Sequence, residues 1–246
     1  PINDEYQDIE INVEETQTGT FNVGLSVGSL DGLSFVSGLK EKNINGTGRS
    51  LEFLINTSEN NRAFTINTTE KFYLNSKINH QYSTNYKESD FSKSKSYKLN
   101  TFGLDTSFNY LLADDIYHTF GVGYTLKDYI VTDSSTVSSN ILQSSGESIS
   151  FNINNQLVLN TTNSYIKPTN GNYISLANYL ETPSSSSNGF LKNVLTAKKY
   201  IKNNNNIYSV QARAGNIYSL NDNEILSDDK FSLGGRWLRG FDAFGA

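Results

Sequence analysis

The chain has 246 residues, a formal net charge of −5 and no cysteine. These values exclude a disulfide framework and a thiolate metal site, and they argue against a nucleic-acid partner, which needs clustered positive charge. The hydrophobic fraction of 36% is low for a globular core of this size, yet 15 Tyr and 14 Phe accompany it. Disordered chains lack such aromatics, so we expect a sheet with one apolar and one polar face.

The sequence begins with Pro1 rather than methionine, and no export signal opens it. We therefore expect a processed product or a part of a longer protein, with any signal lying upstream. No stretch reaches the roughly 18 apolar residues of a membrane helix.

The first segment, residues 1–17, is acidic and places Ile9, Ile11 and Val13 on one side of an alternating pattern. A period of two predicts a half-buried strand. After Gly19 the polar side of the alternation becomes small and uncharged. The strand that follows has two faces, Phe21, Val23, Leu25 and Val27 on one and Asn22, Gly24, Ser26 and Gly28 on the other.

About ten more segments with this period follow, up to about residue 218. We place them near residues 33–41, 49–57, 62–70, 76–87, 95–110, 116–128, 147–160, 172–182, 189–201 and 206–218. The pattern is clearest over 147–160, and no segment has a convincing helical period. A repeat of about 18 residues is long for a soluble sandwich and suits membrane strands, which need about 9–11 residues to cross.

The connections fall into two alternating sets. One set is mostly short, as at 43–48 and 202–205, with 161–171 as an exception, and the other contains long Ser- and Asn-rich loops such as 129–146. Membrane barrels keep short turns on the periplasmic side and long loops outside. Because an odd count of about eleven strands does not close a single-chain barrel, and bare edges are costly in lipid, closing strands are missing from this chain. The sequence thus predicts an all-β fold, an incomplete antiparallel transmembrane β-barrel.

Two of the connections have motifs that resemble those of one family. Residues 43–48 contain Asn-Gly, a strong hairpin signal, and Gly46 and Gly48 resemble the family's Gly-Thr-Gly turn after the second strand. Pro168 and Gly171 resemble its Pro-Thr-x-Gly turn. The family is that of the BamA-like outer-membrane assembly and translocation barrels, which carry periplasmic POTRA domains.

The most specific resemblance to this family lies in residues 233–241, Leu-Gly-Gly-Arg-Trp-Leu-Arg-Gly-Phe. The segment is similar to the family's Gly-Gly…Arg-Gly-Phe motif, although Leu238 stands where Val is usual. The resemblance implies a long outer loop that folds back into the barrel lumen. The residues that match the motif are Gly234, Gly235, Arg239, Gly240 and Phe241.

The chemistry of the Arg-Gly-Phe segment agrees with an anchor inside a barrel. A buried charge is costly unless it is paired, and the planar guanidinium of Arg239 suits a fixed bidentate contact. Gly240 permits close backbone approach, and Phe241 offers an apolar contact. The resemblance places the acidic partner of Arg239 on a later strand, downstream of residue 246.

The resemblance divides the chain into residues 1–18, the end of the last POTRA-like domain, and residues 19–246, a barrel truncated in its long outer loop. It implies a non-enzymatic insertase of the bacterial outer membrane, without cofactors, whose N-terminal side is periplasmic. Its partners would be the lipid bilayer, unfolded outer-membrane clients and accessory lipoproteins on upstream POTRA domains. Phe21 to Gly28 would be a gate strand that pairs with client strands at a weak lateral seam, and Gly24 and Gly28 would loosen it.

Other polar residues give no sign of catalysis or metal binding. His80 and His118 are the only histidines, and both fall in expected strands without carboxylate or cysteine partners at ligand spacing, so we interpret them as barrel residues. The acid pairs Asp114-Asp115 and Asp228-Asp229 fall in connections and are interpreted as solvated charge. No Gly-x-Ser-x-Gly nucleophile motif is present.

Three alternatives stay open at this point. A secretion pore or an autotransporter assembly factor of the same superfamily would differ in its upstream POTRA domains. A passive porin or adhesin barrel would need neither a POTRA tail nor an inward Arg-Gly-Phe loop. A soluble β-rich binding module, such as a lectin-like sandwich, would fold without detergent and would pack its apolar faces against each other.

Overall fold

A computed structural model describes residues 10, 12, 14, 16–28, 32–183, 189–221, 224–226, 228–231 and 233. The described chain forms a single antiparallel sheet of 11 strands, in which each strand pairs with its neighbours in sequence. The strands are β1 (Gly19–Gly28), β2 (Gly32–Glu41), β3 (Arg49–Thr57), β4 (Asn61–Glu70), β5 (Ile78–Asp90), β6 (Tyr97–Ala113), β7 (Ile116–Val131), β8 (Gly146–Asn160), β9 (Gly171–Glu181), β10 (Phe190–Asn203) and β11 (Asn206–Ser219).

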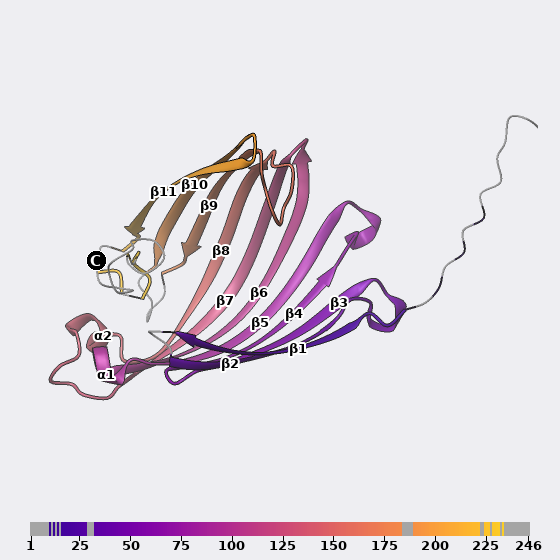
Figure 1. Cartoon of the computed structure of the whole chain (residues 1–246). Helices are drawn as coiled ribbons and strands as arrows, with labels where there is room; N and C mark the ends of the chain where they lie inside the picture. The colour runs from indigo at the N-terminus through magenta and orange to yellow at the C-terminus, as the bar shows by residue number, and fades with distance from the viewer. Residues whose placement is uncertain are drawn as a thin grey trace, which may run out of the picture.

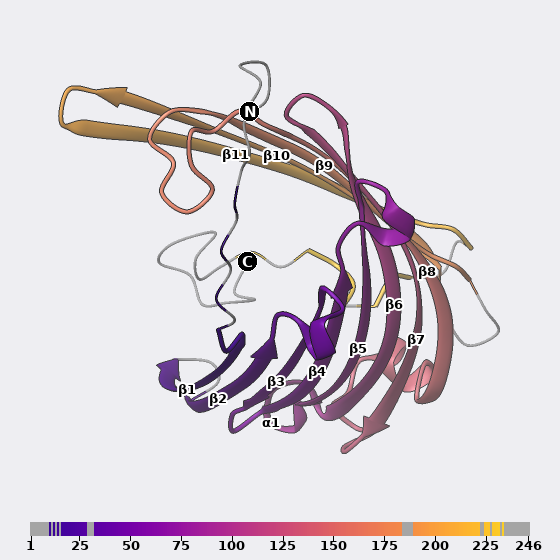
Figure 2. The ribbon, with the colours of Figure 1, turned by 90° about the vertical axis from the view of Figure 1, so that its right-hand side faces the viewer.

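The sheet curves into an open wall (Figure 1). Seen end on in Figure 2, it forms an arc with β1 at one end and β11 at the other. The two end strands do not pair with each other in the described part of the chain. The prediction of eleven antiparallel strands in a barrel wall is therefore confirmed. The sandwich alternative is wrong, because every described strand lies in one sheet and no second sheet packs on it within the described part of the chain.

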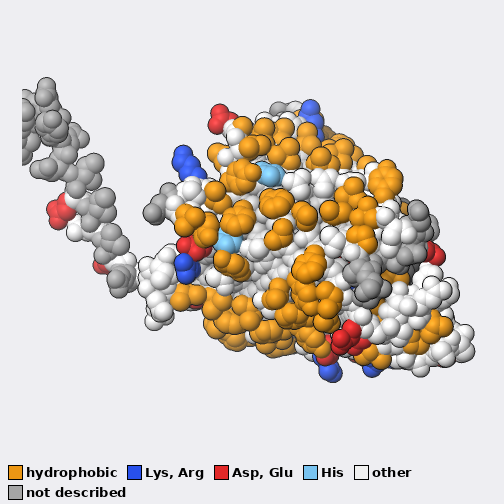
Figure 3. All heavy atoms as spheres, turned by 180° about the vertical axis from the view of Figure 1, so that it is seen from behind, with side chains coloured by type: hydrophobic (Ala, Val, Ile, Leu, Met, Phe, Trp, Pro, Cys, Tyr) orange, Lys and Arg blue, Asp and Glu red, His pale blue; other side chains and the backbone are white. Residues whose placement is uncertain are grey.

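The period-two alternation decides what each face of the wall presents. Large apolar side chains lie exposed on the convex face, where Figure 3 shows them over much of the surface. Soluble proteins rarely expose apolar patches of this size. The concave face carries small and polar side chains, such as Ser83, Asp105, Ser107, Thr119 and Asn154, which line one cavity. Apolar outside and polar inside is the arrangement of a membrane barrel.

Strand length varies along the wall. Strands β1 to β4 have 9 or 10 residues, about what is needed to cross the hydrocarbon of a bilayer. Strands β6, β7 and β8 have 17, 16 and 15 residues. The longer strands continue beyond that thickness, at the end of the wall that carries the short helices α1 (Ser92–Lys95) and α2 (Ser139–Gln143).

A small apolar core lies at this same end of the wall. Tyr97, Tyr129 and Ile141 are each only 1% exposed, and Leu99 and Leu226 join them. These residues come from β6, β7, α2 and a segment after β11, so the core ties the long strands to two connections. Burial of each aliphatic side chain contributes about 1.5–3 kcal/mol. No helix in the described parts of the chain is long and apolar enough to cross a membrane.

The strand expected over residues 1–17 is wrong for the residues that can be assessed. Residues 10, 12, 14 and 16–18 are in no strand, and all but Thr18 are exposed. Alternation supplies an apolar face, but a strand also needs a neighbour that pairs with its backbone hydrogen-bonding groups, and no described strand pairs with these residues. The prediction that residues 1–18 end a POTRA-like domain remains a prediction.

The glycines of the two turn motifs have backbone conformations that favour glycine. Gly46 and Gly48 each have φ of +73° in the β2–β3 connection, next to Asn45 at +50°. Gly171 has φ of +107°, and a Cβ built there would lie 2.3 Å from the carbonyl oxygen of Thr161. Only glycine fits this position. Pro168 lies in the same connection, before β9.

Candidate functional site

The first candidate site is the free edge of β1. The strand pairs with β2 in a continuous register from Gly19↔Glu41 to Gly28↔Gly32 and has no neighbour on its other side among the described residues. All ten residues of β1 are exposed, with Phe21 at 68% and Val27 at 83%. Its outer edge therefore offers a row of backbone donors and acceptors to another strand.

The predicted gate residues divide between the two faces of this strand. Phe21, Val23, Leu25 and Val27 continue the apolar row of Leu33, Phe35 and Leu39, whose Cα atoms lie opposite them in β2 or two residues along. Asn22, Gly24, Ser26 and Gly28 face the lumen. A Cβ built on Gly24 or Gly28 would meet nothing within 4 Å. The lumenal side of β1 is thus held by almost no side-chain packing.

The start of β1 is held by side chains rather than by a sheet neighbour. The Thr18 hydroxyl donates a hydrogen bond to the Glu41 carboxylate, which also accepts one from the Asn43 backbone N–H at 2.8 Å. These contacts fix the point at which the chain enters the wall. The free part of the edge then begins at Gly19.

The second candidate site is a segment after β11 that is docked against the inner face of the wall. We call residues 224–226 and 228–231 the docked segment. The Asp229 carboxylate accepts a hydrogen bond from Lys127 Nζ of β7 at 2.8 Å, and the two side chains are 16% and 14% exposed. Lys127 Nζ also lies 3.6 Å from Glu181 of β9. One lysine thus serves two carboxylates inside the lumen.

The neighbouring aspartate of the docked segment binds a different strand. The Tyr97 hydroxyl of β6 donates to both carboxylate oxygens of Asp228, at 2.7 and 2.9 Å. Lys95 Nζ lies 3.7 Å from the same carboxylate. Burial raises the pKa of the Asp229 carboxyl, although the ammonium of Lys127 acts in the opposite direction. The acid pair therefore bridges the docked segment to two long strands and α1.

Apolar contacts complete the docking. Leu226 is buried in the core at the α1 end of the wall. The Phe231 ring lies under Lys192 Nζ, 4.6 Å from the ring centroid, and a Cβ built on Gly215 of β11 would approach Phe231 Cζ to 2.5 Å. A side chain at Gly215 would therefore displace the Phe231 ring from its present position. The docked segment contacts β6, β7, β10 and β11.

These contacts correct the interpretation of Asp228-Asp229 as solvated charge. Both carboxylates are paired with wall residues more than 100 positions away in sequence, and nothing in the local pattern reveals such partners. The predicted loop motif, Gly234, Gly235, Arg239, Gly240 and Phe241, lies outside the described residues. Its anchor role stays a prediction, and the docked segment directly precedes it in the chain.

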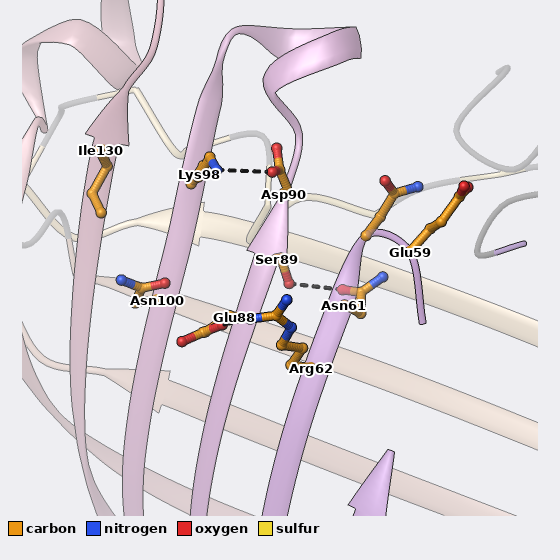
Figure 4. Close-up of a pocket in the computed structure, with 10 residues that line it drawn as sticks. Glu59, Asn61, Arg62, Glu88, Ser89, Asp90, Lys98, Asn100 and Ile130 are labelled. Carbon is orange, nitrogen blue, oxygen red and sulfur yellow. Dashed lines mark hydrogen bonds and ion pairs between the residues drawn. The ribbon is translucent and has the colours of Figure 1, made fainter. Parts of the chain in front are cut away.

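A polar cavity of about 290 Å³ lies at the α1 end of β4 to β7. Figure 4 shows its charged side chains, among them Lys98 with Asp90 at 3.0 Å. Arg62 lies 3.7 Å from Glu88. Both cations that line the cavity are paired with carboxylates, and Glu59 adds a further negative charge, so its described residues offer no excess positive charge to a ligand. Its position at the ends of the strands suits the polar boundary of an apolar belt.

The two histidines lie in strands on the convex face. His80 is 3% exposed and stacks on Phe108 at 4.3 Å between ring centroids. His118 lies between the Tyr110 hydroxyl and the Asn155 side chain. No cluster of three or more metal-ligating side chains occurs among the residues that the structure describes. We found no arrangement there for nucleophilic or acid–base chemistry.

Together, the curved antiparallel sheet, its apolar convex face and the inward docked segment define the wall of a transmembrane β-barrel. The Omp85 superfamily domain matches residues 43–246 of the chain. The chain therefore belongs to the Omp85 superfamily, and the resemblance seen in its sequence motifs is confirmed.

Two curated relatives are outer membrane protein assembly factors named BamA. The chain is 31% identical to that of Buchnera aphidicola over 120 residues, which cover 48% of this chain and 19% of that protein. It is 26% identical to that of Neorickettsia risticii over 244 residues, 96% of this chain and 32% of that protein. The chain thus spans less than a third of the length of these relatives.

Two solved structures share the fold. BamA from Haemophilus ducreyi lacking POTRA domains 1–3 superposes with a TM-score of 0.79 at 21% identity, over 94% of this chain and 47% of that one. CdiB from Acinetobacter baumannii superposes with a TM-score of 0.57 at 14% identity, over 92% of this chain and 43% of that one. The described wall corresponds to about half of each of these chains.

Proposed function

We propose that this chain is the first part of the barrel of a bacterial outer-membrane insertase, which folds and inserts β-barrel proteins without enzymatic chemistry or cofactors. The single observation that carries the proposal is the sparse side-chain packing of β1 in a wall of this family, because all ten of its residues are exposed and a Cβ built on Gly24 or Gly28 would meet nothing within 4 Å. The names of the two curated relatives support the assembly role.

The mechanism is strand templating. A client strand pairs with the outer edge of β1 through backbone hydrogen bonds, which are independent of side-chain sequence. In hydrocarbon an unpaired backbone group costs several kcal/mol, so a client strand gains most by pairing before it enters the lipid. The edge of β1 would supply that pairing at the membrane.

A weak seam beside β1 would result from the short length of strands β1 to β4 and from the sparse packing of β1. Strands β1 to β4 are no longer than the hydrocarbon thickness requires, and the space beside Gly24 and Gly28 on the inner side of β1 is empty to 4 Å. Glycine in a strand interior weakens it. The region beside β1 would therefore separate from its closing partner at a lower cost than any region near β7.

The docked segment would brace the opposite part of the wall. Its contacts span β6 to β11, and the predicted Arg239 anchor would continue that brace. The end of the wall with α1 and α2 would face the outside, and the residues before β1 would lie in the periplasm. Further partners would be the lipid bilayer, unfolded client barrels and accessory lipoproteins on upstream POTRA domains.

Site-specific cross-linking in the full-length protein tests templating directly. A photo-cross-linker at Val23 of β1 should capture the terminal strand of a client that is stalled during insertion. The matched control is Phe64 of β4, which also lies exposed on the apolar face but in a strand paired on both sides. Capture at Phe64 and not at Val23 would reject templating by β1.

The related alternative is a secretion or translocation pore of the same superfamily, in which a client passes through the lumen. The same experiment separates the two functions. A pore would give cross-links from the lumenal Asn154 of β8 to extended client, whereas an insertase gives them from Val23 to a client strand.

A further inference from the structure

A row of hydrogen-bonded carboxamides crosses the apolar face of the second half of the wall. Asn155 of β8 donates through Nδ2 to Asn178 Oδ1 of β9 at 3.0 Å. Asn178 donates to Asn193 of β10 at 2.6 Å, and Asn193 donates to Asn216 of β11 at 2.8 Å. The three pairs are direct register partners in the sheet. We call these four residues the amide ladder.

The amide ladder continues toward the middle of the wall. The Asn155 Oδ1 atom lies 2.6 Å from His118 Nε2 of β7, and His118 Nδ1 lies 2.6 Å from the Tyr110 hydroxyl of β6. One chain of hydrogen bonds thus joins six adjacent strands from β6 to β11. Stacked amides of this kind stabilise sheets because each amide is both a donor and an acceptor.

The row lies on the lipid side of the wall. On one flank of the amide ladder the register aligns Leu157, Leu176, Leu195 and Ala214. On the other flank it aligns Ile153, Leu180, Leu191 and Tyr218. Polar groups between two such apolar rows are costly in hydrocarbon unless each has a partner. The amide ladder gives each internal member two.

Asn216, the last residue of the amide ladder, differs from the others in its hydrogen bonding. Asn216 accepts from Asn193, but its own Nδ2 has no acceptor within the described part of the chain, and β11 is an edge strand there. Every earlier amide donates toward the next strand in sequence. Asn216 therefore presents a donor, on the lipid side, to whatever strand covers β11.

We propose that the strand pairing with β11 in the complete protein has a hydrogen-bond-accepting side chain opposite Asn216, which extends the amide ladder across that seam. A carboxamide, carboxylate or hydroxyl side chain fits this position. The chain spans less than a third of its curated relatives, and the occupant that we propose is a further strand of the same protein. The inference rests on the proposed membrane placement and not on the assembly role.

The direct test is a structure of the full-length protein in lipid nanodiscs. We expect an acceptor oxygen on the adjacent strand about 2.7–3.2 Å from Asn216 Nδ2. An aliphatic residue at that register position would overturn the proposal. The result is discriminating because lipid-facing positions are otherwise mostly apolar.

A variant series gives a second test in the full-length protein, read as the temperature at which the barrel unfolds in a gel-shift assay. Asn178→Leu removes two links, and we expect a lower midpoint. Asn216→Leu should lower the midpoint to a similar extent, because it too would break a link on each side. A midpoint for Asn216→Leu equal to or above that of the wild type would overturn the proposal.

The matched control is Ala214→Leu, on the same face of β11 but outside the amide ladder. Leucine suits lipid, so this variant should leave the midpoint unchanged or raise it. If the Asn178→Leu variant does not fold, the structure of the wild-type protein in nanodiscs still shows whether an acceptor lies opposite Asn216. Both measurements need only a folded barrel, so a protein without assembly activity can still confirm or reject the amide ladder.

Discussion

Strands β1 to β4 and strands β6 to β8 belong to one sheet but are stabilised in different ways. The first group is short, and its leading strand is exposed at every position. The second group is longer by five or more residues, and it contacts the apolar core and the docked segment. Strand β1 therefore has few stabilising side-chain contacts, whereas β6 to β8 have many. Apolar and polar residues alternate in the same way in both regions.

This difference shows how one barrel can be both stable and open to a partner. Proteins open locally where buried contacts are few. In this wall the contacts that are not backbone ladder bonds concentrate around β6 to β10 and are sparse at β1. Substitutions in the two regions should therefore have unequal effects, and matched pairs of variants can measure the inequality.

The largest effect is expected at Lys127. Lys127→Met removes the ammonium that pairs with the carboxylates of Asp229 and Glu181 inside the lumen. Loss of one partner of a buried pair costs about 3–5 kcal/mol, measured as the free energy of unfolding of the full-length barrel in detergent. The docked segment should also become sensitive to protease.

Lys40 is the matched control in the lightly held region. It pairs with Glu52 at 3.2 Å, but its side chain is 43% exposed. Lys40→Met should cost no more than about 1 kcal/mol, as is usual for exposed pairs. Equal losses at Lys40 and Lys127 would contradict the contrast between the two regions.

A smaller effect is expected at Tyr97. Tyr97→Phe removes the hydroxyl that binds both oxygens of Asp228, and a hydrogen bond to a charged group contributes about 1.5–3 kcal/mol. The control is Tyr86→Phe in β5, whose hydroxyl binds Glu88 at an exposed position and which should change stability little. Denaturant unfolding of both variants measures the difference.

The smallest of the three effects compares glycines in the two edge strands. Gly215→Val places a side chain where the Phe231 ring lies, and overpacking of this kind costs about 1–3 kcal/mol. Gly24→Val enters open space in β1 and should stay within about 0.5 kcal/mol of the wild type. A costly Gly24→Val with a neutral Gly215→Val would reverse the assignment of the two edges.

The sheet could be predicted from the sequence because alternation is a local signal. All eleven strands are predicted from the sequence, and the ends that differ most are the C-terminal ends of β5, β6 and β7, which lie at Asp90, Ala113 and Val131 and not at residues 87, 110 and 128. The acidic segment at residues 1–17 also alternates, yet its described residues form no strand. Alternation of apolar and polar residues indicates a segment with two different faces. It does not indicate whether another strand lies beside that segment to pair with it.

The docked segment and the amide ladder could not be predicted, because both depend on contacts between distant residues. Lys127 and Asp229 are 102 positions apart, and no spacing rule links them. The amide ladder left a weak signal, since Asn155, Asn178, Asn193 and Asn216 each interrupt an apolar face. Their alignment depends on register, and a shift of one residue would move each to the other face.

Hydrogen exchange of the full-length protein in nanodiscs, with and without a peptide matching the terminal strand of a client, tests the gate role of β1 most directly. Without peptide, the amides of residues 19–28 should exchange faster than those of β6 to β8. With peptide, exchange over residues 19–28 should slow while β6 to β8 stay unchanged. Slowing confined to other strands, or none at residues 19–28, would contradict the proposal that β1 receives client strands.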